Sequence, residues 1–144
     1  MKKMRKLLKN EKGLTLVELL AVIVILAIVA AIAVPAIGNI IENSRYNAVK
    51  ADATNVLSAA QLYFTDEASA TTVTVQQLKT SNYLESSGKI LDTVSIAKGK
   101  PNTITTSAIK FSGDKTVTFT AASMEKINAD ITKGSDIKTG QEIK

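Results

Sequence analysis

The sequence predicts an α+β fold in which one long N-terminal helix packs on a small antiparallel β-sheet. Residues 19–37 are all apolar, and residues 46–64 carry apolar side chains at helical spacing. From residue 68 onward the chain becomes rich in Thr, Ser and β-branched residues, which favour strands. We therefore expect a helix with an apolar first half and an amphipathic second half, followed by a β-rich domain.

The apolar run is long enough to cross a membrane. Its roughly 20 residues match the thickness of a bilayer, and Pro35 is its one conformational interruption. Residues 1–13 contain six basic residues and one acid, Glu11, and the positive-inside rule places such a basic end in the cytoplasm. Six basic residues precede the run: Lys2, Lys3, Arg5, Lys6, Lys9 and Lys12.

Glu18 stands at the entrance to this apolar run. A carboxylate at membrane depth costs about 3 kcal/mol on insertion scales, so such residues usually have a partner and a function. An acid tolerated at the membrane interface without a role is the alternative.

The net charge of +5 comes entirely from the N-terminal leader. Residues 1–13 hold 6 of the 18 basic residues and 1 of the 13 acids, whereas residues 14–144 hold 12 of each. The basic run therefore indicates membrane topology rather than nucleic-acid binding.

The residue inventory argues against an enzyme. The chain contains no Cys and no His, which excludes disulfides, thiolate or histidine metal sites and triads with an imidazole base. Ser112-Gly113-Asp114 and Gly134-Ser135-Asp136 are interpreted as turns rather than ligand loops. We predict no metal site and no cofactor.

The second half of the helix has one apolar face, which predicts packing against the domain that follows. This domain is too small and too polar to form a generous core by itself. The apolar face steps by 3 or 4 residues through Tyr46, Val49, Ala53, Val56, Ala60 and Tyr63, with Leu57 and Phe64 beside it.

The β-rich domain is predicted to contain one short helix and three or four strands. The helix is expected within residues 74–83, and the strands at 93–97, 107–111 and 116–121, the last two joined in a hairpin. In the third strand Val117, Phe119 and Ala121 alternate with threonines, which predicts one buried face. A fourth strand is expected at 127–131, and the tail from Gly134 is expected to be irregular.

Lys12-Gly13 followed by Leu14-Thr15-Leu16-Val17-Glu18-Leu19 resembles the class III signal of type IV prepilins and pseudopilins. In that family a prepilin peptidase cuts after the glycine and methylates the new N-terminal residue, here Leu14. Glu18 stands fifth after Gly13 and Pro35 twenty-second, as is common in the family. A cut after Gly13 would remove the charged leader and retain the apolar segment, unlike a secretory signal.

The sequence departs from the common pattern at three points. Leu14 replaces the usual phenylalanine, Ala27 stands where many Gram-negative pilins have glycine, and the absent cysteines exclude a C-terminal disulfide loop. These features resemble Gram-positive, clostridium-like major pilins. The resemblance implies the pilin fold, with residues 1–13 as leader, 14–41 as transmembrane and filament-core helix, 42–67 as its amphipathic half and 68–144 as head.

Cleavage would turn the neutral amide nitrogen of Leu14 into a charged amine and so give Glu18 a partner. That amine could belong to a neighbouring subunit or to the same chain, since Glu18 lies four residues from Leu14 on one helix face. Pro35 and Gly38 mark an expected helix kink, since proline removes one backbone donor.

The resemblance implies a structural subunit of a type IV pilus that assembles with identical copies into a helical surface filament. It implies a precursor in the cytoplasmic membrane and, as partners, prepilin peptidase, the assembly ATPase and platform, and minor pilins. The filament would be a fimbrium used in twitching motility, cell adhesion, biofilm formation or DNA uptake. The alternatives are a pseudopilin of a type II secretion or competence system and a membrane-anchored binding module.

Overall fold

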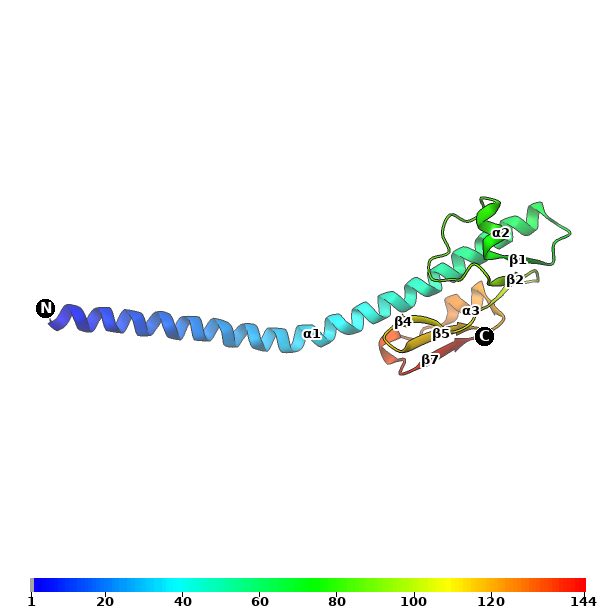
Figure 1. Cartoon of the computed structure of the whole chain (residues 1–144). Coiled ribbons are helices and arrows are strands. Elements are labelled where there is room, and N and C mark those ends of the chain that lie inside the picture. Colours follow the sequence, from blue (N-terminus) through cyan, green and yellow to red (C-terminus); the bar gives the residue numbers. More distant parts are fainter. Residues whose placement is uncertain (1) are drawn as a thin grey trace. The chain divides into compact units, whose positions relative to one another are not determined.

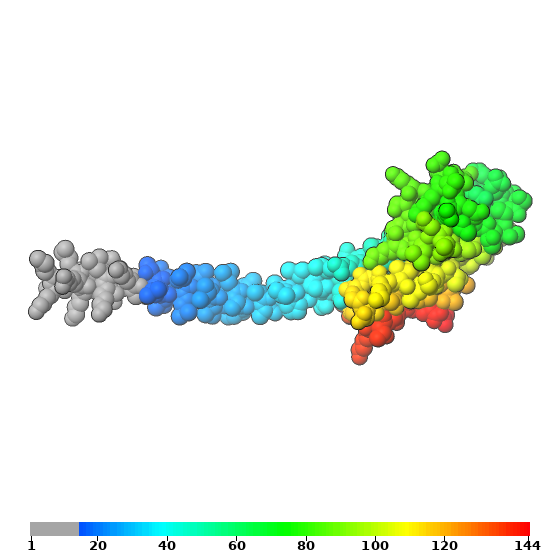
Figure 2. All heavy atoms as spheres, viewed as in Figure 1, coloured from blue at the N-terminus to red at the C-terminus, as the bar shows by residue number. Residues whose placement is uncertain are grey.

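The computed structural model describes the backbone of residues 2–144 and the side chains of residues 15–144; the side chains outside this range are grey in Figure 2. Two compact units are present, Met1–Gly38 and Asn39–Lys144. Helix α1 (Lys2–Asp66) belongs to both units, with its residues up to Gly38 in the first and the rest in the second. The predicted fold class, a long N-terminal helix with an antiparallel sheet, is confirmed.

The strands of the second unit form two small sheets (Figure 1). One sheet is fully antiparallel, with strand order β1 (Thr72–Thr74), β2 (Ser95–Ala97), β3 (Thr103–Thr105) and β6 (Ala122–Ser123). The other has the order β4 (Ile109–Ser112), β5 (Lys115–Phe119) and β7 (Gly140–Ile143). Strands β4 and β5 form the predicted antiparallel hairpin, and β7 pairs with β5 in parallel.

The second half of α1 supplies one wall of the core. Tyr46, Val49, Ala53, Val56 and Ala60 are completely buried, so the predicted apolar face is confirmed. Across the first sheet Val73 pairs with Ile96 and Ile96 with Ile104, which makes a row of buried β-branched side chains. Val117 and Phe119 of β5 are also fully buried.

The predicted short helix is present as α2 (Val75–Thr80). Thr74 caps it by accepting a hydrogen bond from the backbone of Gln77, whose side chain accepts one from the backbone of Thr74. This reciprocal pair satisfies two backbone donors that the first helical turn leaves unpaired. Val75 and Leu78 then anchor the helix in the core.

The strand expected at residues 127–131 is wrong, because helix α3 (Met124–Ala129) occupies this region. Ser123 accepts a hydrogen bond from the backbone of Lys126 and begins the helix. Ile127 is fully buried whereas Ile131 is 92% exposed. The two isoleucines that bound the expected strand are therefore one buried helical residue and one exposed residue outside the helix.

Two other expectations near the C-terminus are wrong. The tail is not irregular, since Gly134–Asp136 form a 3-10 helix and β7 completes the second sheet. Ala121 is exposed, with a backbone φ of 47°, and the neighbouring Ala122 is buried instead. Strand β5 ends at Phe119, so the alternating pattern stops before it reaches Ala121.

Gly134 lies where the 3-10 helix approaches α1. A Cβ at this position would stand 2.6 Å from the backbone oxygen of Glu42 and 2.7 Å from Cβ of Tyr46. We expect Gly134→Ala to lower the free energy of unfolding by about 3 kcal/mol, because neither of these atoms belongs to a flexible side-chain end. Denaturant unfolding of the full chain in detergent measures this change.

Gly113→Ala is the matched control. Gly113 has a φ of 52° and no heavy atom within 4 Å of a built Cβ, so only backbone strain opposes alanine there. This strain costs about 1 kcal/mol. Equal losses in the two variants would contradict the close approach of Gly134 to α1.

Candidate functional site

The apolar segment of α1, residues 16–41, exposes its large side chains. Their exposed fractions range from 45% at Ile41 to 71% at Ile32. By length and composition, one helix among residues 15–144 is suited to cross a membrane, and its most apolar window is unburied. Soluble monomers rarely expose a continuous apolar surface of this extent, so a membrane or another protein must cover it.

Glu18 lies on this segment and its side chain is exposed. The predicted cleavage and methylation residues, Gly13 and Leu14, lie outside the residues whose side chains are described. The pairing of Glu18 with the amine of Leu14 therefore stays a prediction. Helical spacing alone places positions 14 and 18 on one face of α1.

Pro35 and Gly38 lie inside α1, which continues through both. Gly38 ends the first compact unit, and a Cβ built on it would have no heavy atom within 4 Å. The kink expected at these residues stays a prediction.

Just beyond this boundary, the first turns of α1 in the second unit bind the head through polar contacts. Lys115 Nζ donates to Glu42 Oε2 at 2.7 Å, and this hydrogen bond lowers the pKa of Glu42 below its ordinary value. Asn43 Oδ1 accepts a hydrogen bond from the backbone of Ser135 at 2.9 Å. These contacts join α1 to β5 and to the 3-10 helix.

One turn after Glu42 and Asn43, Tyr46 of α1 contacts Asp130, the residue that follows α3. Asp130 receives hydrogen bonds on both carboxylate oxygens. The Tyr46 hydroxyl donates to Oδ2 at 2.6 Å and the Thr132 hydroxyl to Oδ1 at 2.6 Å. Lys50 Nζ lies 3.2 Å from Oδ2, and the side chains of Lys50 and Asp130 are only 14% and 11% exposed. We call Tyr46, Lys50, Asp130 and Thr132 the Asp130 cluster.

The environment of this cluster shifts two pKa values. Burial by itself would raise the pKa of Asp130, but hydrogen bonds from Thr132, Tyr46 and Lys50 outweigh burial and lower it. Burial and the bond to Asp130 raise the pKa of the Tyr46 hydroxyl. No pattern in the sequence indicated this cluster, because Tyr46 and Lys50 stand 84 and 80 residues before Asp130 along the chain.

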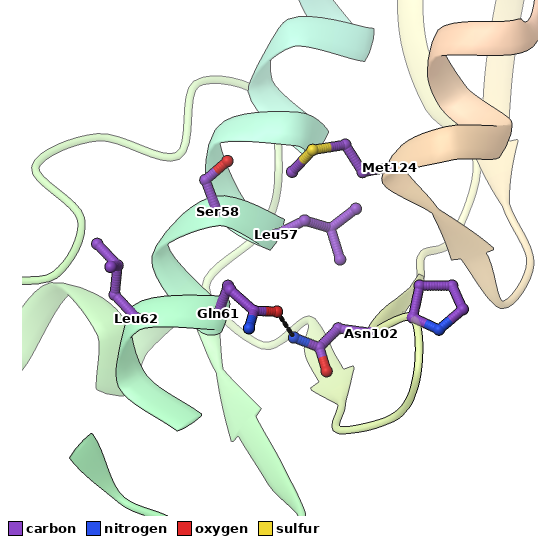
Figure 3. Close-up of a pocket in the computed structure, with 7 residues that line it drawn as sticks. Leu57, Ser58, Gln61, Leu62, Asn102 and Met124 are labelled. Carbon is purple, nitrogen blue, oxygen red and sulfur yellow. Dashed lines mark hydrogen bonds between the residues drawn. The ribbon is translucent and has the colours of Figure 1, made fainter. Parts of the chain in front are cut away.

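An apolar groove of about 420 Å³ lies at the far end of α1, between this helix, Pro101 and α3 (Figure 3). The side chains of Leu57, Leu62 and Met124 line it, and its polar members bond to protein atoms. Asn102 Nδ2 donates to Gln61 Oε1 at 2.7 Å, and the Ser58 hydroxyl donates to the carbonyl of Thr54. Such a groove offers an apolar surface and no acid, base or activated nucleophile.

Comparison with protein families identifies one match. Residues 8–34 match the family described as the prokaryotic N-terminal methylation motif. Neither the curated proteins nor the solved structures contain a match to the chain. The match covers the predicted cut after Gly13, Glu18 and most of the apolar run, and the head lies outside it.

The Asp130 cluster predicts a loss of stability in acid. A carboxylate whose folded pKa is depressed contributes its full stabilisation above its unfolded pKa, 3.8 for Asp130, and loses it as the pH falls through the folded value. We expect Asp130→Asn to be less stable than the unaltered chain by about 2 kcal/mol at pH 7, and this difference to shrink below about pH 4.

Thermal unfolding of the full chain in detergent, from pH 7 to pH 2, measures both effects. Asp114→Asn is the control, because the Asp114 side chain is fully exposed and its nearest cation, Lys110, lies 3.9 Å away. Its unfolding profile should follow that of the unaltered chain. Equal stability of Asp130→Asn and the unaltered chain at pH 7 would show that the cluster does not stabilise the head.

Proposed function

We propose that this chain, which carries the class III signal of type IV pilins within residues 8–34, is the precursor of a major pilin. The observation that carries this proposal is that the signal leads directly into the exposed apolar segment and overlaps most of it. Gly13 and Glu18 lie within the matched residues, and the large apolar side chains from Leu16 to Ile41 are exposed. The protein is a structural subunit and not a catalyst.

Processing prepares the chain for assembly. Prepilin peptidase cuts after Gly13 and methylates the amine of Leu14, which keeps its positive charge. Glu18 then acquires a cationic partner that the uncleaved precursor lacks. An unpaired charge in an apolar environment is strongly destabilising, so this pair selects the correct axial register between neighbouring subunits.

The apolar segment serves in two environments. Before assembly it anchors the precursor in the cytoplasmic membrane, and afterwards it packs with identical segments in the filament core. Both environments bury apolar surface, so the exchange is close to neutral and an assembly ATPase can drive it through the platform machinery. Head-to-tail contacts between identical subunits that do not close into a ring produce a filament, in which minor pilins take related places.

A pseudopilin of a secretion or competence system carries the same signal and is the second candidate. Electron microscopy of cells that produce the chain distinguishes the two. Long surface fibres that contain this chain support the pilin. Their absence from cells that still secrete protein or take up DNA favours the pseudopilin.

We expect Gly13→Val to block leader removal, because a branched side chain at the cut site obstructs the peptidase. Mass measurement of the native chain should show loss of residues 1–13 and gain of one methyl group, whereas Gly13→Val should keep its leader. Gly38→Val is the control, since this glycine lies in open space in the same helix and should allow cleavage. Normal processing of Gly13→Val would mean that the cut lies elsewhere.

We expect Glu18→Val to insert into the membrane and lose its leader normally, but to assemble about tenfold less fibre. The substitution removes the carboxylate and leaves the amine of Leu14 unpaired in an apolar environment. Fibre yield relative to membrane-bound chain measures this effect. Glu125→Val, which removes an exposed acid of α3, should assemble normally, and unchanged fibre yield from Glu18→Val would contradict the pairing.

A further inference from the structure

We propose that the end of the head beside residue 42 binds anionic phospholipid headgroups while the apolar segment anchors the chain. This inference rests on the proposed function, in which the precursor waits in the cytoplasmic membrane. We call this end the base of the head. It consists of three stretches that meet in the fold, residues 42–45, 110–115 and 133–138 (Figure 1).

Contacts within the second compact unit bring the three stretches together. The Ser112 hydroxyl donates to Glu42 Oε1 at 3.3 Å, and Lys115 Nζ donates to Glu42 Oε2 at 2.7 Å. Lys115 Nζ also donates to the backbone oxygen of Ser135 at 3.1 Å, and Asn43 accepts from the backbone nitrogen of Ser135 at 2.9 Å. The base is therefore fixed against the turn of α1 that follows the apolar segment.

The base carries an excess of positive charge that the rest of the head lacks. It holds five basic and three acidic residues, a net charge of +2. The rest of the second compact unit, Asn39–Lys144, holds seven basic and eight acidic residues, a net charge of −1. Glu42 and Lys115 compensate one another, because their side chains pair at 2.7 Å. The exposed charges that remain at the base are two acids, Asp114 and Asp136, and four cations, Arg45, Lys110, Lys133 and Lys138.

Three of these cations have no partner in the fold. Among residues 15–144, the side chains of Arg45, Lys133 and Lys138 form no ion pair and no hydrogen bond. Lys110 lies 3.9 Å from Asp114, and both side chains are largely exposed, so this pair is weak. The cations of the base are therefore available to an anion outside the chain.

The position of the base matches the headgroup layer of a membrane. The hydrocarbon core is about 30 Å thick in a bilayer of about 40–45 Å, so each headgroup layer is about 5–7 Å deep. Arg45 stands four residues after Ile41, the last large apolar residue of the segment, which is about 6 Å along a helix. Lys133 precedes Gly134, on which a Cβ would stand 2.6 Å from the backbone oxygen of Glu42. A membrane that covers the segment through Ile41 therefore brings its phosphates to the base.

Anionic phospholipid is the partner that the charge and the position of the base select together. Each Lys or Arg close to an anionic membrane surface strengthens binding about fivefold. This attraction acts within a Debye length, about 8 Å at physiological salt, which the base satisfies when the segment is anchored. Extraction of the segment removes the base from the lipid. The contact therefore holds the head against the membrane only before assembly.

The full chain inserted in lipid vesicles tests this inference. The chain has no native Cys, so Thr139→Cys places a single fluorescent label at an exposed position next to Lys138. Quenching by a nitroxide on the lipid headgroup reports contact of this label with the membrane surface. Both leaflets have the same composition, so either orientation of the chain gives the same readout.

We expect the quenching constant to be at least about fivefold larger in vesicles of phosphatidylglycerol and phosphatidylcholine than in phosphatidylcholine alone. This difference should vanish at about 1 M salt, because the Debye length then shrinks to about 3 Å. A label at Ser69→Cys, an exposed residue beyond the end of α1, should not respond to lipid charge.

Two variants with equal loss of positive charge separate the base from the rest of the head. The base variant should lose the response of the Thr139→Cys label to lipid charge, and it carries three substitutions: Arg45→Gln, Lys133→Gln and Lys138→Gln. The matched control should keep the response, and it removes three exposed cations outside the base: Lys100→Gln, Lys126→Gln and Lys144→Gln.

Equal quenching of the Thr139→Cys label in the two kinds of vesicle overturns the inference, and so does an equal response of the two variants. Quenching that follows the amount of chain per vesicle instead of the lipid charge indicates contact between copies and also overturns it. If alkaline carbonate extracts the full chain from the vesicles, the proposed anchoring itself fails. If the chain stays anchored but its label ignores lipid charge, only this inference fails.

Discussion

The core of the head depends on one face of α1. The two sheets have only short strands, and their buried row of Val73, Ile96 and Ile104 needs an apolar partner to exclude water. Tyr46, Val49 and the alanines that follow them on the helix provide it. A domain of this size buries too little surface by itself, so the helix is part of its core.

The part of α1 before residue 42 is in a different environment from the part that packs in the core. There the large apolar side chains stay exposed, and this chain provides no core for them among the residues described. The polar contacts of Glu42, Asn43 and the Asp130 cluster lie just after this segment and hold the following turns against the head. Their position allows α1 to be fixed at one end while its apolar segment remains available for lipid or for other copies.

The sequence predicted the helical parts of this structure better than its strands. The 3.6-residue period from Tyr46 to Phe64 is strong because every member packs on one core. Strands β1, β3 and β6 have only two or three residues each, too few for a period of two to be recognised. The strand expected at 127–131 was wrong because five residues are too few to distinguish a strand from the end of a short helix that is followed by an exposed residue.

The sequence by itself determined the candidate signal, the apolar segment and the buried face of α1, because each is a local pattern of residue types along one helix. Only the tertiary structure decided which residues bind α1 to the head. Lys115 reaches Glu42, and Asp130 reaches Tyr46 and Lys50, across more than 70 residues of chain, and no local pattern encodes such pairs. The parallel pairing of β7 with β5 was decided in the same way, because its backbone hydrogen bonds depend on the spatial position of β5.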